Sequence, residues 1–385
     1  MSEPDAPIFE DQTTGTTETV GEQIDDGRGR IFPCEQCGAD LEFSIGQQSL
    51  QCPYCGHVKQ LAPSAEEIRE NDYQQMLVQL KTLRQDGGEQ QATLGDHEVR
   101  CNSCGANVVF SGTLTSSTCP YCAAPLQRDK IHDAESRIPV DAVLPFLIPR
   151  ERAAQNLREW VRTRWFAPND FQRDGANGKF NGCYLPYFTF DSATFTRYDG
   201  QRGDHYWVTV QHGKDTRQER RTRWSSASGE FDRFFDDVLA VAAKDEYGAL
   251  LQALEPWPLG KCVPYTPEVL AGLFARTYDL PLETAFQDAK RRIDAALHTD
   301  ICRRIGGDEQ SVSSQKTAYN ALTFKHVLLP VWLLAYRYQG KPYRVSINAA
   351  TGEVNGERPY SWIKITLFAL MCAAIVLTLF AVTQR

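Results

Sequence analysis

The 385-residue sequence lacks the motifs that define two large classes of enzyme. It has no GxxxxGK(S/T) loop, and Leu259-Gly-Lys-Cys262 lacks both the first glycine and the final hydroxyl residue of that motif. Because this loop holds the phosphates of a bound nucleotide, its absence excludes helicase activity. The seven histidines are scattered and form no HExxH pair, which excludes the zinc-protease arrangement. We therefore expect no enzymatic activity, no catalytic residue and no small-molecule substrate.

The N-terminal region lacks a signal peptide and has few apolar residues. No charged-then-apolar leader is present, so we expect the chain to remain on the cytoplasmic side. Residues 1–30 carry eight acidic side chains against Arg28 and Arg30, and they account for most of the chain's formal net charge of -8. A segment of this composition is predicted to be a disordered acidic tail.

Cysteine, in contrast, is abundant, and eight of the twelve cysteines form two copies of one pattern. In each copy a CxxC is followed, after fourteen residues, by a second CxxC. Each CxxC forms a tight turn that directs two sulfurs at one point, and the hairpin between the turns completes a tetrahedral four-sulfur shell suited to Zn2+. We predict two zinc ribbons, at residues 31–61 and 99–128. Their ligands are Cys34, Cys37, Cys52 and Cys55 in the first ribbon and Cys101, Cys104, Cys119 and Cys122 in the second.

Both predicted zinc ions are structural, because four cysteine ligands leave no open coordination position. A disulfide framework is the alternative for the eight cysteines, but it requires an oxidising compartment and the spacing is typical of metal sites. Three further cysteines are isolated and are interpreted as small buried hydrophobic side chains rather than nucleophiles. They are Cys183, Cys262 and Cys302.

The C-terminal region contains an apolar segment without charge, proline or glycine, from Ile365 to Val382. As a helix it would extend about 27 Å, enough to span a bilayer with Trp362 and Lys364 at the interface. We predict a transmembrane tail anchor over residues 363–383. A buried core helix is the alternative, but a core helix needs only an apolar stripe, whereas this segment is apolar all round.

Two arguments place the body of the chain in the cytoplasm. Arg344, Arg358 and Lys364 precede the anchor and only Arg385 follows it, which is a bias of the positive-inside kind. Eight metal-binding thiols also favour a reducing compartment. The expected localisation is the cytoplasmic (inner) membrane, with a single pass and the body in the cytoplasm.

The region between the ribbons and the anchor mixes helix and strand signals, which predicts an α+β fold. A helical linker over 62–98 would begin at a capping box, Ser64-Ala-Glu-Glu67. An α+β interaction domain follows over 138–360. Its predicted helices cover 150–164, 231–243, 266–275 and 282–304, and its predicted strands cover 182–190, a hairpin around 212–215 and a closing hairpin over 327–348. Leu185-Pro and Leu329-Pro each introduce an aromatic strand, so a degenerate repeat and chance similarity both remain open.

Several short motifs accompany the ribbons and the anchor. They are Trp165-Phe-Ala-Pro-Asn169, Gly182-Cys-Tyr-Leu-Pro-Tyr187, Val263-Pro-Tyr-Thr-Pro267, Leu329-Pro-Val-Trp332 and Asn348-Ala-Ala-Thr-Gly352. With these motifs, most of residues 30–385 resembles a family of bacterial tail-anchored zinc-ribbon membrane proteins, often catalogued as relatives of the primosomal replication factor Y helicases. The resemblance implies a role in envelope stress at the cytoplasmic membrane, beside phage-shock-type and SPFH or virion-core-like proteins.

We interpret the chain as a non-enzymatic, membrane-anchored adaptor that recruits protein partners and contacts membrane lipid. The alternative is a membrane-tethered nucleic-acid-binding protein, because zinc ribbons often bind nucleic acid and a basic run occupies 214–223. Asp215 and Glu219 interrupt this run, which argues against duplex DNA and leaves lipid, phosphate or solvent as its contact. A third hypothesis is an enzyme with an unrecognised site in the central domain.

Overall fold

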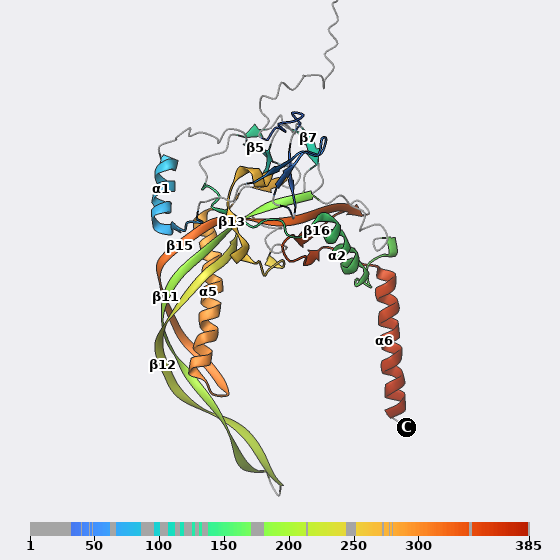
Figure 1. Ribbon diagram of the computed structural model, residues 1–385. Helices are drawn as coiled ribbons and strands as arrows, with labels where there is room; N and C mark the ends of the chain where they lie inside the picture. Colours follow the sequence, from blue (N-terminus) through green and yellow to red (C-terminus); the bar gives the residue numbers. More distant parts are fainter. Residues whose placement is uncertain are drawn as a thin grey trace, which may run out of the picture.

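The computed structural model describes residues 32–383, and structural statements below refer to these residues. The gaps are 40, 46, 48, 62–66, 86–95, 101–106, 112–115, 119–124, 128–130, 133–137, 171–180, 213–214, 244–251, 272, 277, 279 and 339–340. The acidic tail predicted over 1–30 lies outside the described residues. The described part mixes helices and strands, and one curved, half-barrel-like sheet dominates it (Figure 1).

Three long antiparallel strands form the centre of this sheet. They are β11 (Asn181–His212), β12 (Asp215–Val241) and β15 (Glu309–Tyr338). The middle strand, β11, pairs with β12 on one side and with β15 on the other. The hairpin predicted around 212–215 is confirmed, since His212 faces Asp215. Figure 1 shows the three strands curving together, with the β11–β12 hairpin extending beyond the rest of the sheet.

The pattern of burial along β11 changes where its surroundings change. From Gly182 to Ser192 every side chain is buried, as expected for a strand covered on both faces. Beyond that point burial alternates: Thr194, Thr196 and Tyr198 are buried, whereas Arg197 is exposed. The buried threonines are satisfied, because Thr196 Oγ1 lies 3.1 Å from Thr317 Oγ1 and Thr194 Oγ1 donates to the Arg233 carbonyl.

Helix α5 (Leu282–Ile305) covers the concave face of the three strands and confirms the helix predicted over 282–304 (Figure 1). It ends at Gly306, whose positive φ of 65° favours glycine at this position. One stripe of the helix is buried against the sheet. Its members are Leu282, Ala285, Phe286, Ala289, Ile293, Leu297, Ile301 and Ile305. Burial of a large apolar side chain contributes about 1.5–3 kcal/mol, so this stripe is a main source of stability.

The helix predicted over 231–243 is wrong, because residues 231–241 belong to β12. The sequence supports both structures: Phe231, Phe235 and Leu239 recur every four residues, which places them on one face of a helix and also of a strand. Phe234 would complete a helical stripe, but its side chain is 64% exposed. Pairing with β11 along almost the whole strand favours the β structure. A register shift between Phe235 and Val238 then places Phe231 and Phe235 in one apolar cluster and Leu239 in another.

The helix predicted over 266–275 is also wrong. A short 3-10 helix, η3 (Pro267–Leu270), is followed by strand β14 (Phe274–Arg276), which pairs in parallel with β11. Contacts with separate units take the place of the predicted helix. The η3 helix contacts β1, and β14 pairs with β11 and β6.

Helix α1 (Tyr73–Gln85) begins later than the capping box predicts, and Ser64 lies outside the described residues. Strand β4 (Asn71–Asp72) precedes it and pairs with β15. The Tyr73 ring lies 4.9 Å from the Phe286 ring of α5, so this helix is attached to the body of the protein.

The remaining elements surround one end of the long strands. Helix α2 (Arg150–Arg162) confirms the helix predicted at 150–164, and β16 (Lys341–Asn348) confirms the closing hairpin with β15. Leu185 and Leu329, the two Leu-Pro positions, face each other across β11 and β15. Smaller elements are β10 (Ala142–Val143), η2 (Leu259–Lys261), β13 (Val263–Pro264) and β17 (Val354–Gly356).

Candidate metal centre and membrane helix

The first predicted ribbon is a three-stranded antiparallel unit in which two tight turns carry the cysteines. Its strands are β1 (Glu42–Ser44), β2 (Ser49–Gln51) and β3 (Val58–Gln60). In the first turn the Gly38 N–H donates to the Cys34 carbonyl, and in the second the Gly56 N–H donates to the Cys52 carbonyl. These two glycines have φ values of 75° and 74°, a conformation that costs glycine little. The two cysteine-bearing turns therefore share the same glycine conformation and the same backbone hydrogen bond.

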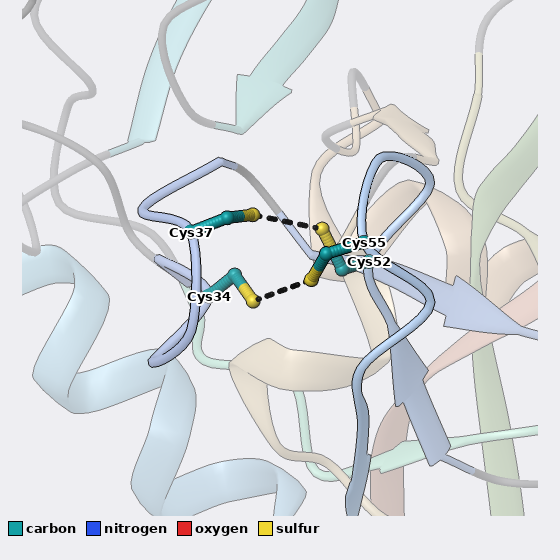
Figure 2. Close-up of side chains that lie close together, drawn as sticks. All are labelled: Cys34, Cys37, Cys52 and Cys55. Carbon is teal, nitrogen blue, oxygen red and sulfur yellow. Dashed lines mark hydrogen bonds between the residues drawn. The ribbon is translucent and has the colours of Figure 1, made fainter.

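The four sulfurs of this ribbon converge on one point (Figure 2). Cys34 Sγ lies 3.5 Å from Cys55 Sγ, Cys37 Sγ lies 3.4 Å from Cys52 Sγ, and all four sulfurs lie within 4.8 Å of one another. Four sulfurs bound to one tetrahedral zinc ion at about 2.3 Å would lie about 3.8 Å apart. These four cysteines fit a zinc ion, and the first predicted metal site is thus consistent with the structure.

The electrostatics of the sulfurs also suit a cation. Backbone N–H groups, first that of Cys55, lower the pKa of Cys52 to about 6 against the opposing effect of burial. For Cys55 the His57 N–H acts in the same direction, but burial and the other three sulfurs outweigh it and raise the pKa to about 12. Four thiolates so close together repel one another, and a divalent cation removes that repulsion.

The ribbon is packed into the body rather than held apart from it. Cys34 and Cys52 are buried in the same apolar cluster as Leu270 and Ala271 of the 266–276 segment, and the Phe43 N–H donates to the Ala271 carbonyl at 2.9 Å. Cys37, Cys55 and the neighbouring side chain of Tyr54, which is 82% exposed, form the outer side. Two cysteines therefore anchor the metal centre in the core and two lie at the surface.

The four cysteines of the second predicted ribbon lie outside the described residues, so the second zinc ion stays a prediction. The strands around them are described: β5 (Asp96–Arg100) pairs with β6 (Asn107–Ser111) and with β9 (Ile131–His132), and β7 (Ser116–Thr118) pairs with β8 (Pro125–Gln127). Strand β6 also pairs with β14 of the body. Residues 266–276 thus contact both the first ribbon and strand β6, which follows Cys104 in the second predicted ribbon.

Helix α6 (Trp362–Thr383) is long and apolar enough to cross a membrane. At about 1.5 Å per residue its 22 residues extend about 33 Å, close to the thickness of a bilayer core. None of the stretch from Trp362 to Phe380 is buried, and Figure 1 shows α6 projecting from the body. The alternative of a buried core helix is wrong for this structure.

A second cluster of ionisable groups, which the sequence analysis missed, lies where β12 departs from regular pairing. Asp191, Asp236 and Asp237 have carboxylate oxygens within 4.8 Å of one another. Lys325 Nζ lies 2.7 Å from Asp237 and 3.3 Å from Glu70, so a side-chain ammonium already supplies positive charge there. The members come from segments far apart in the sequence, and no local motif signals them.

Asp191 makes the stability of the folded protein depend on pH. Burial, supported by a hydrogen bond with the Glu70 carboxylate, raises the pKa of Asp191 to about 7. An unfolded aspartate titrates near 4, so the folded state holds this proton more tightly, and its stabilising effect is lost as pH rises from about 4 through 7. The same hydrogen bond is the main cause that lowers the pKa of Glu70 from its ordinary value.

We expect the free energy of unfolding of the wild-type protein to fall by on the order of 2 kcal/mol between pH 5 and pH 8 relative to that of Asp191→Asn. Asparagine keeps the side-chain oxygen that accepts the Asp237 N–H and removes the ionisation. Thermal unfolding of the two proteins across this pH range measures the difference. Asp199→Asn, at an exposed position on the same strand, is the control and should follow the wild type. Parallel pH profiles for wild type and Asp191→Asn would contradict the assignment.

The three isolated cysteines lie apart from the metal centre. Cys183 is completely buried in the core, and burial raises the pKa of Cys262 to about 12. Such a thiol is a poor nucleophile at neutral pH, as the sequence interpretation expects. Cys302 lies half-buried on α5.

Comparisons with known proteins leave the class of this chain open. No family model matches it, and no solved structure matches it. Among curated proteins it is similar to the uncharacterized protein YdjG of Bacillus subtilis (strain 168), at 25% identity over 234 residues, 57% of this chain and 63% of that protein. The chain therefore spans less than two thirds of the length of this relative.

Proposed function

We propose that this protein is a membrane-anchored zinc-ribbon adaptor that recruits protein partners to the cytoplasmic face of the cytoplasmic membrane. One observation carries the proposal: a four-cysteine cluster with no open ligand position is packed into the core of a chain that continues into an exposed, apolar helix. A closed site of four cysteine ligands stabilises structure and does not activate a substrate. It therefore supports a rigid surface at a fixed attachment to the membrane.

The outer side of the first ribbon is the surface that we assign to a partner. Tyr54 lies there between Cys52 and Cys55, and Val58 is 39% exposed. Exposed aromatic residues on a rigid support are typical of protein interfaces. The family resemblance supports phage-shock-type and SPFH or virion-core-like proteins as partners and envelope stress as the setting.

The nucleic-acid-binding alternative depends on the basic run at 214–223, which lies at the end of the β11–β12 hairpin. Arg221 forms a 3.1 Å ion pair with Glu219, and Asp204 faces Arg223 across the strands. Asp308 and Glu309 of the adjoining β15 region lie against His205. Acidic groups thus accompany the arginines, which weakens attraction to a phosphate backbone.

We expect charge reversal at Arg217, Arg220 and Arg221 to leave partner recruitment to the membrane largely unchanged. The fragment from Arg30 to Tyr360 is expected to show no measurable binding to duplex DNA at physiological salt. Fluorescence anisotropy with labelled duplex, repeated over a range of salt concentrations, is the measurement. Micromolar or tighter binding that weakens steeply with salt would support the nucleic-acid alternative. In that case, each phosphate contact removed by charge reversal should reduce the slope of log affinity against log salt concentration by about 0.9.

A further inference from the structure

The turn that follows α2 is attached to the first turns of α6. The Ser361 N–H donates to the Phe166 carbonyl at 2.8 Å, and Lys364 Nζ donates to the Ala167 carbonyl at 2.8 Å. The rings of Trp165 and Phe166 also lie 5.8 and 5.4 Å from the ring of Phe368 on α6. Residues 165–167 therefore lie at the depth at which α6 would enter a bilayer.

The side chains around this junction are aromatic and exposed. Trp165 is 62% exposed, Trp362 is 80% exposed and Tyr360 is 57% exposed. Burial in the protein does not explain three such rings, whereas Trp and Tyr are enriched at the boundary between lipid headgroups and acyl chains. We refer to Trp165, Phe166, Tyr360 and Trp362 as the aromatic collar.

Positive charge adjoins the aromatic collar, since the Arg358 guanidinium lies 5.2 Å from the centre of the Tyr360 ring. Residues 150–166 contain more arginines than glutamates, and the buried face of α2, formed by Ala153, Leu157 and Val161, leaves Arg158 and Arg162 exposed. Burial, with the charge of nearby Arg358, lowers the pKa of Arg164. An anionic headgroup near Arg164 and Arg358 would offset the repulsion between their charges.

We propose that the Trp165–Phe166 turn is a second membrane contact, which inserts beside α6 at the headgroup boundary of an anionic phospholipid bilayer while the arginines of α2 face the headgroups. The inference rests on the proposed membrane anchoring by α6. It is carried by the continuity of the turn with the first turns of that helix and by the complementary charge of α2. With two contacts, the turn and α6 together set the orientation of the body relative to the bilayer.

This arrangement limits the direction of α6. Figure 1 shows the β11–β12 hairpin and α6 extending from the body toward the same side. The hairpin carries exposed arginines and cannot enter hydrocarbon. The direction of α6 in a bilayer must therefore leave the hairpin outside the hydrocarbon while Lys364 and Phe368 keep their contacts with residues 165–167.

The test uses the full-length protein in nanodiscs that contain phosphatidylglycerol and phospholipids brominated near the headgroup end of the acyl chains. Bromine quenches tryptophan fluorescence at short range, so the quenched intensity reports which of the seven tryptophans reach the lipid. Trp165→Phe and Trp362→Phe are each expected to reduce the quenched intensity. Trp207→Phe, which alters an exposed tryptophan on the hairpin, is the matched control and is expected to leave it unchanged.

The outcomes separate this inference from the anchor itself. A reduction with Trp362→Phe but none with Trp165→Phe would overturn the second contact and leave the anchor intact. No reduction with either variant would overturn the anchor and with it the inference. The contribution of Trp165 to the quenched intensity is also expected to decrease when Arg158 and Arg162 are both changed to glutamine, or when phosphatidylcholine replaces phosphatidylglycerol. An unchanged contribution in both cases would overturn the assignment to anionic headgroups.

Discussion

Replacing Cys37 with serine is expected to lower the zinc content by one ion per chain and to unfold residues 32–61. Structural zinc contributes on the order of 10 kcal/mol in small zinc domains, more than so small an apolar core supplies alone. Because Cys34 and Cys52 belong to the cluster that contains Leu270 and Ala271, loss of the ribbon also exposes residues 266–271 of the body. Elemental analysis gives the zinc content, and hydrogen exchange at Phe43 and Leu50 reports the unfolding.

The control for this experiment is Cys302→Ser, which removes a thiol from α5 at a distance in sequence from the ribbon. It is expected to keep the wild-type zinc content and the same protection of Phe43. Retention of all bound zinc by Cys37→Ser, with unchanged exchange in the ribbon, would contradict the assignment of four cysteine ligands.

Deleting residues 361–385 is expected to move the protein from the membrane fraction to the soluble fraction. Transfer of about eighteen apolar residues into lipid is effectively irreversible, whereas each arginine near an anionic surface contributes only about 1 kcal/mol. The Trp165–Phe166 turn alone is too small to replace the helix. Carbonate extraction followed by quantitative immunoblotting measures the distribution of the protein.

A point-variant pair supports the deletion. Arginine at both Leu370 and Ile375 costs about 3 kcal/mol per residue at the centre of a membrane helix and is expected to release much of the protein. Valine at the same two exposed positions keeps the helix apolar and should retain it in the membrane. Continued membrane association of the truncated chain would show that another part of the protein, or a partner, holds it there.

Local patterns predict those parts of the fold in which one interaction decides the structure. The stripe of α5 from Leu282 to Ile305 has a single helical interpretation, and the hairpin at 212–215 joins two strand-like segments. Residues 231–241 fit both periods, and only their pairing with a strand far away in the sequence decides between them. The first part of β15, from Glu309 to His326, is polar and partly exposed, so no apolar pattern identifies it.

The candidate sites also include parts that local sequence predicts and parts that it does not. The first metal centre can be predicted because all its ligands lie within one short segment and zinc requires their spacing. The packing of this metal centre against residues 269–271 cannot be predicted from the sequence, since that contact joins elements more than two hundred residues apart. Asp191, Glu70 and Lys325 likewise meet only after the long strands pair. Each is an ordinary charged residue in its own segment.

The most direct test of the account follows a tagged phage-shock-type or SPFH-type protein of the host cell and measures the share of it bound to the membrane. Intact protein is expected to bring this partner to the membrane, whereas Cys37→Ser and the deletion of 361–385 are each expected to leave it in the cytoplasm. Charge reversal at Arg217, Arg220 and Arg221 should behave like the wild type. If the membrane-bound share of every such protein stays the same when this chain is removed, the proposed adaptor function is contradicted.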